Sequence, residues 1–357
     1  MTSLYGLADA PPAFIYAATG SFAVLLVVTS SLPSVRFPRP DCNLLAIGIL
    51  LLAGISAYVY GMLLLSGGFR RLSFDLLSVY EVRAEFTKTM APFMGYFVPW
   101  QATVINIVLL CYGLYKKRRW LIALACVAQL LIFGMTGHKS FLLAPMLAGG
   151  VYFIWRTKNV LSYIFGGATL LALAAYLLFL ISGNLLAPAI LVHRLFFVPA
   201  GLHLIYYDFF SQPEHPLVML SNSILAPFVP YPYEVPIMWV ISRAYWGRDF
   251  SPNVGYLGDA YAHFGFMGMF LFSIVLGVFL RVLDGAGSRL PSHLVAAIVA
   301  VPAMALTNAG LFTSLLTHGL IPTLVVIWLL RAAEARRNES ARLTVRELVQ
   351  VKSKTFL

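Results

Sequence analysis

The sequence predicts an all-α, polytopic membrane protein, and three observations lead to this fold class. Of the 357 residues, 60% are apolar and only 11% are charged, so the chain cannot present a polar surface on every side. The mean hydropathy is +0.83. Apolar runs also recur at about the 20-residue length that crosses a bilayer core. The sequence shows no soluble domain, internal repeat or low-complexity linker.

Nine apolar stretches are predicted to form the membrane helices. They are residues 13–32, 43–65, 93–115, 120–136, 140–155, 159–183, 262–280, 292–309 and 311–330. Two of them, 120–136 and 140–155, are short and separated by three residues, so we expect a tight helical hairpin. A further run, 193–210, either lies along the membrane interface or dips into the membrane and returns, which gives about 9–11 helices. Residues 1–330 then form a single transmembrane domain, followed by a basic tail at 331–357.

The distribution of basic residues predicts the orientation in the membrane. Most of the 25 Lys and Arg fall on alternate loops and on the tail. These positions are Arg36, Arg39, the run 116–119, Arg156, Lys158, Arg281, Arg289 and seven bases from Arg331 to Lys354. The positive-inside rule assigns them to the cytoplasm, with the C-terminus, and leaves the loops 67–91 and 184–261 outside. The net charge of +11 therefore indicates topology and contact with anionic lipid, and not nucleic-acid binding.

The cysteines and acids predict neither a metal nor a cofactor. Cys42, Cys111 and Cys126 lie at or within apolar segments, at spacings that suit neither a metal site nor a disulfide framework. The sequence also has no obvious cluster of acids for a divalent metal.

The loop 67–91 contains a predicted amphipathic helix at 74–88. Helical spacing places one polar set on a common face: Asp75, Ser78, Glu81, Glu85 and Lys88. Arg83 falls on the opposite, mainly apolar face, next to Tyr80. Either Arg83 snorkels to headgroup phosphate, or its guanidinium faces a cavity that holds a phosphorylated lipid, which its fork geometry suits.

The hairpin tip, from Thr136 to Ser140, predicts an anion site. Lys139 places an ammonium beside the N-terminus of the following helix, where unpaired N–H groups already favour negative charge. His138 precedes it. The alternative is a tight turn at Gly137 with two solvated polar side chains.

The run 193–210 carries opposite charges at helical spacing. Arg194, Gly201 and Asp208 fall nearly on one stripe, and Pro199 should kink or break the helix at its middle. Broken helices with charged ends are usual at membrane-embedded substrate sites. The alternative is an interfacial helix whose charges are in water and whose Tyr206 and Tyr207 form an aromatic belt.

The stretch from Asn253 to Phe266 gathers polar groups at the mouth of an apolar run. Asp259 and His263 are four residues apart and share a face if the helix has begun by Asp259, so the carboxylate could orient the imidazole as a general base. Tyr261 lies between them. Alternatively, Asp259 is an N-cap or first-turn acid.

These motifs, taken in order over residues 75–330, resemble the O-antigen and oligosaccharide repeat-unit polymerases of bacterial envelopes. The motifs are Tyr80-x-x-Arg83, Gly137-His138-Lys139-Ser140, Arg194 with Pro199-Ala200-Gly201, Tyr206-Tyr207-x-Phe209, Gly258-Asp259-Ala260-Tyr261 and Phe264-Gly265-Phe266-Met267-Gly268. This chain has Ala200 directly after the proline, where a Pro-Gly step would place a glycine.

The resemblance implies a membrane polysaccharide polymerase, a metal-independent glycosyltransferase similar to the membrane-embedded GT-C enzymes. Such an enzyme transfers a glycan linked to undecaprenyl pyrophosphate onto the non-reducing end of an incoming lipid-linked repeat unit. The reaction would take place at the outer, periplasmic face of the bacterial inner membrane, in the synthesis of lipopolysaccharide O-antigen or a related polysaccharide. No cofactor is implied, and a chain-length regulator protein is a possible partner.

The resemblance also suggests roles for individual residues. Arg83, Lys139 and Arg194 would stabilise the pyrophosphate, and Asp259, His263 or His138 would be the base. Four tyrosines would stack on sugars: Tyr80, Tyr206, Tyr207 and Tyr261. Asp208 and Asn253 complete the expected substrate-binding set, and we expect all these residues to converge at the outer face.

Three other functions share parts of this chemistry. An O-antigen ligase uses the same donor and differs mainly in its acceptor. A flippase for lipid-linked oligosaccharides also needs cations for pyrophosphate, but it usually shows related halves, which this sequence lacks. A membrane O-acyltransferase would need a buried histidine, for which His318 is the best-placed candidate. A polymerase gives a ladder of chain lengths, a ligase gives glycan on lipid A, and a flippase makes no glycosidic bond.

Overall fold

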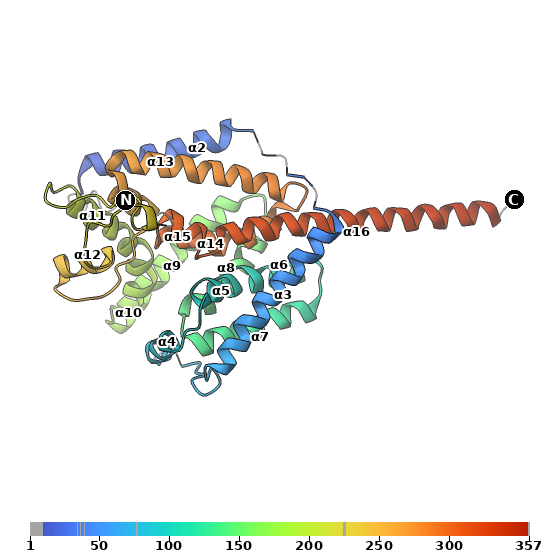
Figure 1. Ribbon diagram of the computed structural model, residues 1–357, viewed down its shortest axis with the longest axis horizontal. Helices are drawn as coiled ribbons and strands as arrows, with labels where there is room; N and C mark the ends of the chain where they lie inside the picture. Colours follow the sequence, from blue (N-terminus) through green and yellow to red (C-terminus); the bar gives the residue numbers. More distant parts are fainter. Residues whose placement is uncertain are drawn as a thin grey trace. The chain divides into compact units, whose positions relative to one another are not determined.

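The computed structural model is 75% helical and describes residues 10–33, 35, 37–38, 40–75, 78–223 and 226–355 (Figure 1). Within these ranges it contains no strand. Arg36 and Arg39, used above to predict orientation, and residues 76–77 of the predicted helix 74–88 lie outside the described residues. The all-α prediction is therefore confirmed for the part of the chain that the structure describes.

Eight helices in the described ranges are long and apolar enough to cross a membrane, as expected for a multi-pass membrane protein. They are α2 (Pro12–Ser31), α3 (Cys42–Leu65), α5–η1–α6 (Met94–Tyr115), α7 (Arg119–Thr136), α9 (Val160–Ser182), η2–α11 (Ala189–Phe210), α13 (Tyr256–Gly287) and the stretch Leu311–Arg337. Two predicted stretches form shorter apolar helices, α8 (Lys139–Ile154) and a helical stretch (Ser292–Thr307) that begins with α14 (Ser292–Met304).

The predicted helix at 311–330 is interrupted near its start. Four residues, 316–319, separate a short helix, α15 (Leu311–Leu315), from α16 (Leu320–Thr355). Gly319 adopts a φ of +93°, a backbone conformation that favours glycine, and this residue ends the turn between the two helices. The continuous helix predicted from hydropathy is therefore wrong at this point.

The chain divides into two compact units. Unit 1 consists of Met1–Pro33, Gly150–Arg281 and Ala300–Leu320. Unit 2 consists of Ser34–Gly149, Val282–Val299 and Ile321–Leu357. Each unit has its own cluster of buried apolar side chains.

The core of unit 2 packs α3 against the segment α5–η1–α6, α7 and the first turn of α8. Its buried side chains are Val59, Leu63, Phe86, Met94, Val98, Ala102, Ile132, Met135 and Phe141. Of these, Phe86 belongs to α4 (Val79–Lys88) and Phe141 to α8. The loop helix and the start of α8 are therefore built on the same core.

A buried polar network joins the helices of unit 2. The amide of Gln101 accepts a hydrogen bond from Ser56 of α3 at 2.8 Å and donates one to Asn106 at 2.8 Å. Asn106 donates to Gln129 of α7 at 2.9 Å, and Gln129 donates to the backbone carbonyl of Phe141 at 2.6 Å. Hydrogen bonds between membrane helices each contribute about 0.6 kcal/mol. The network thus ties the start of α8 to three neighbouring segments.

The core of unit 1 is formed by α2, α11 (Val198–Phe210), α12 (Ile237–Trp246), α13 and α15. Side chains such as Phe14, Ile241 and Met269 are fully buried there. In Figure 1, α2 and α13 run side by side, and two glycines allow the close approach. A Cβ at Gly20 would lie 3.1 Å from Phe270, and one at Gly277 would lie 2.6 Å from Val28.

The loop helix of unit 2 is shorter than predicted. It begins at Val79 instead of residue 74, and Ser78 lies outside it: the Ser78 hydroxyl lies 2.8 Å from that of Ser73 and donates to the Asp75 carbonyl, a local bond that competes with the helix. Asp75 therefore does not belong to the polar helix face predicted from the sequence. Glu81, Glu85 and Lys88 remain within α4.

Pro199 changes the type of helix without interrupting it. Residues Ala189–Phe197 form the π-helix η2, and the α-helix α11 begins at Val198 with Pro199 in its first turn, where a missing N–H costs no helical hydrogen bond. The predicted break is therefore a change of hydrogen-bonding pattern. The α-helical spacing that aligned Arg194 with Asp208 does not apply to Arg194, which lies in η2.

Helix α13 contains a sharp break that the hydropathy pattern does not predict. Phe264 and Gly265 have non-helical dihedral angles, with φ of +60° at Gly265. Just beyond the break, a Cβ at Gly268 would lie 2.1 Å from the carbonyl oxygen of Ala260. The first two turns of α13, which carry Asp259 and His263, thus form a separate helical segment.

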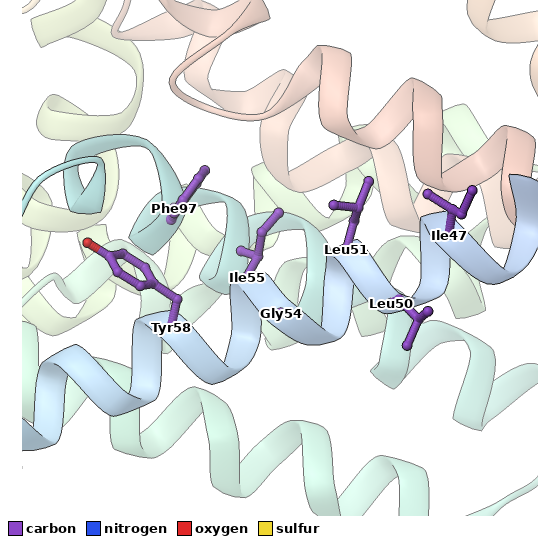
Figure 2. Close-up of a pocket in the computed structure, with 7 residues that line it drawn as sticks. All are labelled: Ile47, Leu50, Leu51, Gly54, Ile55, Tyr58 and Phe97. Carbon is purple, nitrogen blue, oxygen red and sulfur yellow. The ribbon is translucent and has the colours of Figure 1, made fainter.

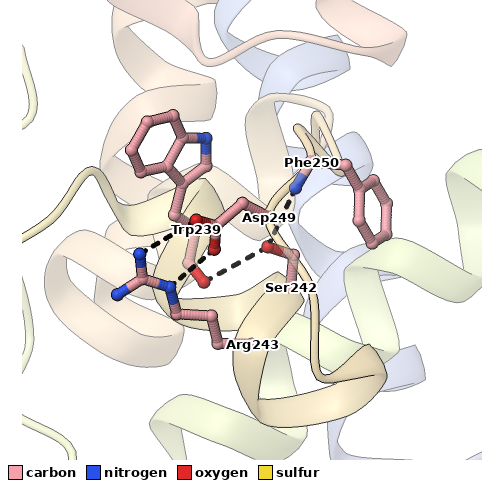
Figure 3. Close-up of polar contacts among 5 residues, drawn as sticks. All are labelled: Trp239, Ser242, Arg243, Asp249 and Phe250. Carbon is pink, nitrogen blue, oxygen red and sulfur yellow. Dashed lines mark hydrogen bonds and ion pairs between the residues drawn. The ribbon is translucent and has the colours of Figure 1, made fainter.

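An ion pair and a hydrogen bond connect α12 to the segment between α12 and α13 (Figure 3). Arg243 donates to both carboxylate oxygens of Asp249, at 2.6 and 3.0 Å, and Phe250 donates its backbone N–H to the Ser242 hydroxyl. The Arg243 guanidinium lowers the pKa of Asp249, and hydrogen bonding to Asp249 raises the pKa of Arg243. Because the pair is exposed, it adds little to the free energy of unfolding. It joins α12 to the segment that leads into α13.

Candidate functional site

Four of the predicted site residues come together in unit 2. Tyr80 and Arg83 lie on α4, while His138 and Lys139 lie at the turn between α7 and α8. The Arg83 guanidinium carbon is 5.9 Å from the centre of the Tyr80 ring, and the Lys139 amine is 5.2 Å from the same centre. Nη2 of Arg83 donates to the Gly137 carbonyl at 3.1 Å. We call Tyr80, Arg83, His138 and Lys139 the basic cluster.

Gly137 allows the two elements to meet. It caps α7 with a φ of +67° and donates its N–H to Phe133 at 2.8 Å. A Cβ at this position would lie 2.4 Å from the Val79 carbonyl oxygen and 3.0 Å from the backbone nitrogen of Arg83. Both the left-handed conformation and the contact with the backbone of α4 therefore require glycine.

A pair of glycine substitutions separates these two requirements. Gly183 caps α9 with nearly the same φ, +66°, but a Cβ there would have no neighbour within 4 Å. We expect Gly183→Ala to cost only the left-handed strain of about 1–2 kcal/mol. Gly137→Ala should cost about 1–3 kcal/mol more, because the methyl group must displace α4. Thermal unfolding of both variants in detergent measures this difference, and equal losses would contradict the close packing of α4 on the turn.

His138 is held as a neutral imidazole with one nitrogen available. Its Nδ1 lies 3.0 Å from the Thr136 carbonyl oxygen, which can only accept, so we infer that Nδ1 carries the proton and Nε2 the lone pair. The ring stacks on Phe141 at 4.9 Å. Burial lowers the pKa of His138 to about 4, and the positive charge of Arg83 adds to this effect. At neutral pH, His138 is therefore a neutral imidazole with an unprotonated Nε2.

The electrostatics of the basic cluster favour an anion. Among the described contacts, neither Arg83 nor Lys139 forms an ion pair, and Nε of Arg83 is buried without a hydrogen-bond partner. The N-terminus of the sixteen-residue helix α8 begins at Lys139 and adds partial positive charge. The Tyr80 side chain is 66% exposed, and the two cations lie 5.9 and 5.2 Å from the centre of its ring. Two phosphate groups could be held here, with an aromatic ring open to a sugar face.

A second group of polar residues lies in unit 1, around Asp259. The helix has begun at Tyr256, so Asp259 is a first-turn residue that shares a face with His263, as the spacing predicted. The Asp259 carboxylate accepts a hydrogen bond from the backbone of Leu311. A Cβ at Gly310 would lie 2.3 Å from one of its oxygens. The carboxylate is thus fixed by close backbone contact, with a side chain that is 16% exposed.

His263 is not available as a proton acceptor in this arrangement. It is 1% exposed, and its Nδ1 accepts a hydrogen bond from the Leu220 backbone N–H at 2.8 Å. A neutral imidazole that accepts at Nδ1 carries its proton on Nε2. Nε2 lies 3.8 Å from Asp259, too far for a hydrogen bond. Of the three predicted bases, His138 and Asp259 remain as candidates.

The predicted sugar-stacking tyrosines differ in accessibility. Tyr206 and Tyr261 are buried, with exposed fractions of 3% and 6%. Tyr261 packs on Tyr207 at 5.1 Å and on Phe266 at 5.2 Å, so it forms part of the unit 1 core. Tyr207 is partly buried in the same group. Among the four, Tyr80 has the most open ring.

Three predicted substrate-binding residues are exposed in unit 1. Asp208 accepts a short hydrogen bond from Tyr245 of α12, and burial together with this carboxylate raises the pKa of Tyr245. Arg194 lies on η2, and the described contacts include no ion pair between it and Asp208. Asn253 lies in the segment between α12 and α13.

Sequence reasoning missed His203 and the polar network of unit 2. His203 is buried, its Nδ1 lies 2.5 Å from the Pro199 carbonyl oxygen, and its ring lies 3.0 Å from the position of a Cβ at Gly255 and 3.2 Å from that of a Cβ at Gly258. It therefore packs on the first turn of α13. Gln101, Asn106 and Gln129 could have been identified from the sequence, because each is a polar residue within an apolar run.

The described residues include three free cysteines and no group of three or more His, Cys, Asp or Glu that could hold a metal ion. Comparisons with protein-family models, with curated proteins and with solved structures find no match to this chain.

Proposed function

We propose that this chain is a membrane polysaccharide polymerase. It transfers a glycan from undecaprenyl pyrophosphate onto the non-reducing end of a lipid-linked repeat unit, as a metal-independent glycosyltransferase related to the GT-C enzymes. The observation that supports this most is the basic cluster, in which Arg83 and Lys139 both lie near the ring of an open tyrosine and Nε of Arg83 lacks a partner among the described residues. The proposed location is the outer face of a bacterial inner membrane, with the C-terminus in the cytoplasm.

In the proposed reaction, the cluster holds the pyrophosphate of the donor. The bond between the anomeric carbon and the pyrophosphate oxygen breaks, and negative charge grows on the leaving group, where Arg83 and Lys139 stabilise it. The acceptor sugar hydroxyl forms the new glycosidic bond and gives its proton to His138 Nε2. The products are a longer lipid-linked glycan, undecaprenyl pyrophosphate and a proton, which the imidazole releases to water.

Two related functions use the same phosphate chemistry. An O-antigen ligase differs only in its acceptor, and the basic cluster would serve it equally well. A flippase needs the cations but has no need of a proton acceptor, and the position of His138 beside them supports transfer over transport.

Binding of the bare lipid tests the phosphate site without requiring catalysis. We expect purified protein in detergent to bind undecaprenyl pyrophosphate more tightly than undecaprenol, and Lys139→Gln to weaken pyrophosphate binding roughly 10- to 100-fold, because a charge-assisted hydrogen bond contributes about 1.5–3 kcal/mol. Lys88→Gln is the matched control, since Lys88 is an exposed base at the end of α4. Native mass spectrometry measures both affinities. Equal affinities for the alcohol and the pyrophosphate would remove the phosphate site.

A further inference from the structure

An apolar groove lies on one side of α3 in unit 2. Its volume is about 400 Å³. Seven residues line it: Ile47, Leu50, Leu51, Gly54, Ile55, Tyr58 and Phe97. In Figure 2, Ile47, Leu51 and Ile55 project from one side of α3, and Phe97 comes from α5.

The groove follows from the spacing of side chains along α3. Ile47, Leu51 and Ile55 recur every four residues and form an apolar row. Gly54 leaves a gap beside this row, because a Cβ there would meet nothing within 4 Å. Tyr58 and Phe97 form one end, with ring centres 5.8 Å apart, and the Tyr58 hydroxyl donates to the Pro92 carbonyl at 2.6 Å.

The surroundings of the groove indicate a hydrocarbon occupant. Only 6% of the residues in the most apolar 18-residue stretch of α3 are buried. Leu50 and Leu51 are 69% and 62% exposed. The only polar side-chain group among the lining residues is the Tyr58 hydroxyl, which is already bonded. A groove with apolar walls on a spanning helix suits a chain that comes from the bilayer.

The groove and the basic cluster are built on the same core. Ile55, Tyr58 and Phe97 pack against the buried cluster that contains Phe86 of α4 and Phe141 of α8. Pro92, which anchors Tyr58, comes four residues after the end of α4. From Ile47 to Tyr58 the helix rises roughly 16 Å, about half the thickness of a bilayer core. The groove and the basic cluster therefore belong to the same unit and share its core.

We propose that the α3 groove binds the isoprenoid tail of a polyprenyl phosphate whose phosphate groups are held by Arg83 and Lys139. A single chain fits a groove bounded by one helix and one aromatic end, whereas a diacyl lipid has two chains to place. The choice of headgroup rests on the proposed function. The groove itself depends only on α3 and Phe97.

A photo-crosslinking experiment tests the tail site directly. The probe is a polyprenyl phosphate with a diazirine in its tail, added to the full-length protein in nanodiscs, followed by mass spectrometry of the labelled peptides. We expect label on residues 47–58 and on the peptide that contains Phe97. Gly54→Leu should reduce this labelling roughly tenfold, equivalent to about 1.4 kcal/mol, by filling the groove.

Gly61→Leu is the matched control. Gly61 lies on the same helix, a Cβ there also has no neighbour within 4 Å, and it does not line the groove. We expect this variant to be labelled like the unmodified protein, and both variants to unfold at the same temperature. Equal loss of labelling in the two variants, or none in either, would overturn the proposal.

Competition identifies the occupant. Unlabelled polyprenyl phosphate should remove the label, while an excess of diacyl phosphatidylglycerol should leave it. Displacement by phosphatidylglycerol, or cross-links from α3 to a second copy of the chain, would also overturn the proposal. If the groove is labelled and no glycan polymer forms in a transfer assay, the proposed function fails and the tail site stands. If polymer forms but the groove is not labelled, the tail site fails and the proposed function stands.

Discussion

Replacing Arg83 with Gln should lower the rate of glycan transfer roughly 10²- to 10³-fold while the protein still inserts and folds. The reason is that Arg83 supplies a fixed cation next to Lys139, and loss of a preorganised group that stabilises developing charge has effects of this size. Nε of Arg83 has no hydrogen-bond partner among the described residues, but the substitution also removes the bond from Nη2 to the Gly137 carbonyl, so the unfolding temperature of the variant is measured beside its rate. The measurement is the initial rate of product formation with a lipid-linked repeat unit.

Arg70→Gln is the control for this prediction. Arg70 is an exposed base in the same loop region, following α3, and it does not belong to the basic cluster. Its substitution should leave the rate within about twofold, as expected for a surface position. If Arg83→Gln retained full activity, or if both variants lost activity equally, Arg83 would not be the group that stabilises the leaving pyrophosphate.

Replacing His138 with Asn should lower the transfer rate roughly 10²- to 10⁴-fold, the range for loss of a general base. Asn keeps a donor close to the position of Nδ1, so the bond to Thr136 can be retained, but it has no counterpart of Nε2. Burial and Arg83 lower the pKa of His138 to about 4, and bound pyrophosphate should raise it towards neutrality. The rate of the unmodified protein should therefore fall at acidic pH as the imidazole becomes protonated.

The comparison that decides the base uses Asp259→Asn. If His138 is the base, His138→Asn should remove the acidic limb of the pH–rate profile, and Asp259→Asn should retain that limb whatever its effect on the maximum rate. The reverse result, loss of the acidic limb in Asp259→Asn alone, would assign the base to Asp259. His263→Asn should keep the limb, because the Nδ1 of His263 is already used by Leu220.

The spanning helices could be predicted because they depend on local information, whereas the sequence singled out the residues of the basic cluster but not their grouping apart from the other site residues. Apolar length is directly visible in helices such as α3 and α9. Gly137 also indicates a turn, and Lys139 at the start of the next helix indicates an anion site. The contact of Arg83 with Gly137 joins residues 54 positions apart, and the helical pattern placed Arg83 on the apolar face that makes this contact.

Other features depend on tertiary packing and could not be predicted from local patterns. The break at Phe264–Gly265 lies inside a continuous apolar run, so hydropathy gives no sign of it. The π-helix η2 alters the spacing on which the Arg194–Asp208 stripe was based. Whether a tyrosine is in the core or open to a sugar depends on neighbours such as Phe14 and Phe266, which sequence spacing does not reveal.

The proposed function requires the chain to join lipid-linked repeat units by metal-independent glycosyl transfer. To test this, purified protein is incubated with one undecaprenyl-pyrophosphate-linked repeat unit in EDTA, and the products are separated by length. We expect a ladder of oligomers that disappears in Arg83→Gln. Unchanged substrate with folded protein, across several candidate repeat units, would contradict the claim and favour a ligase that lacks its acceptor or a transporter.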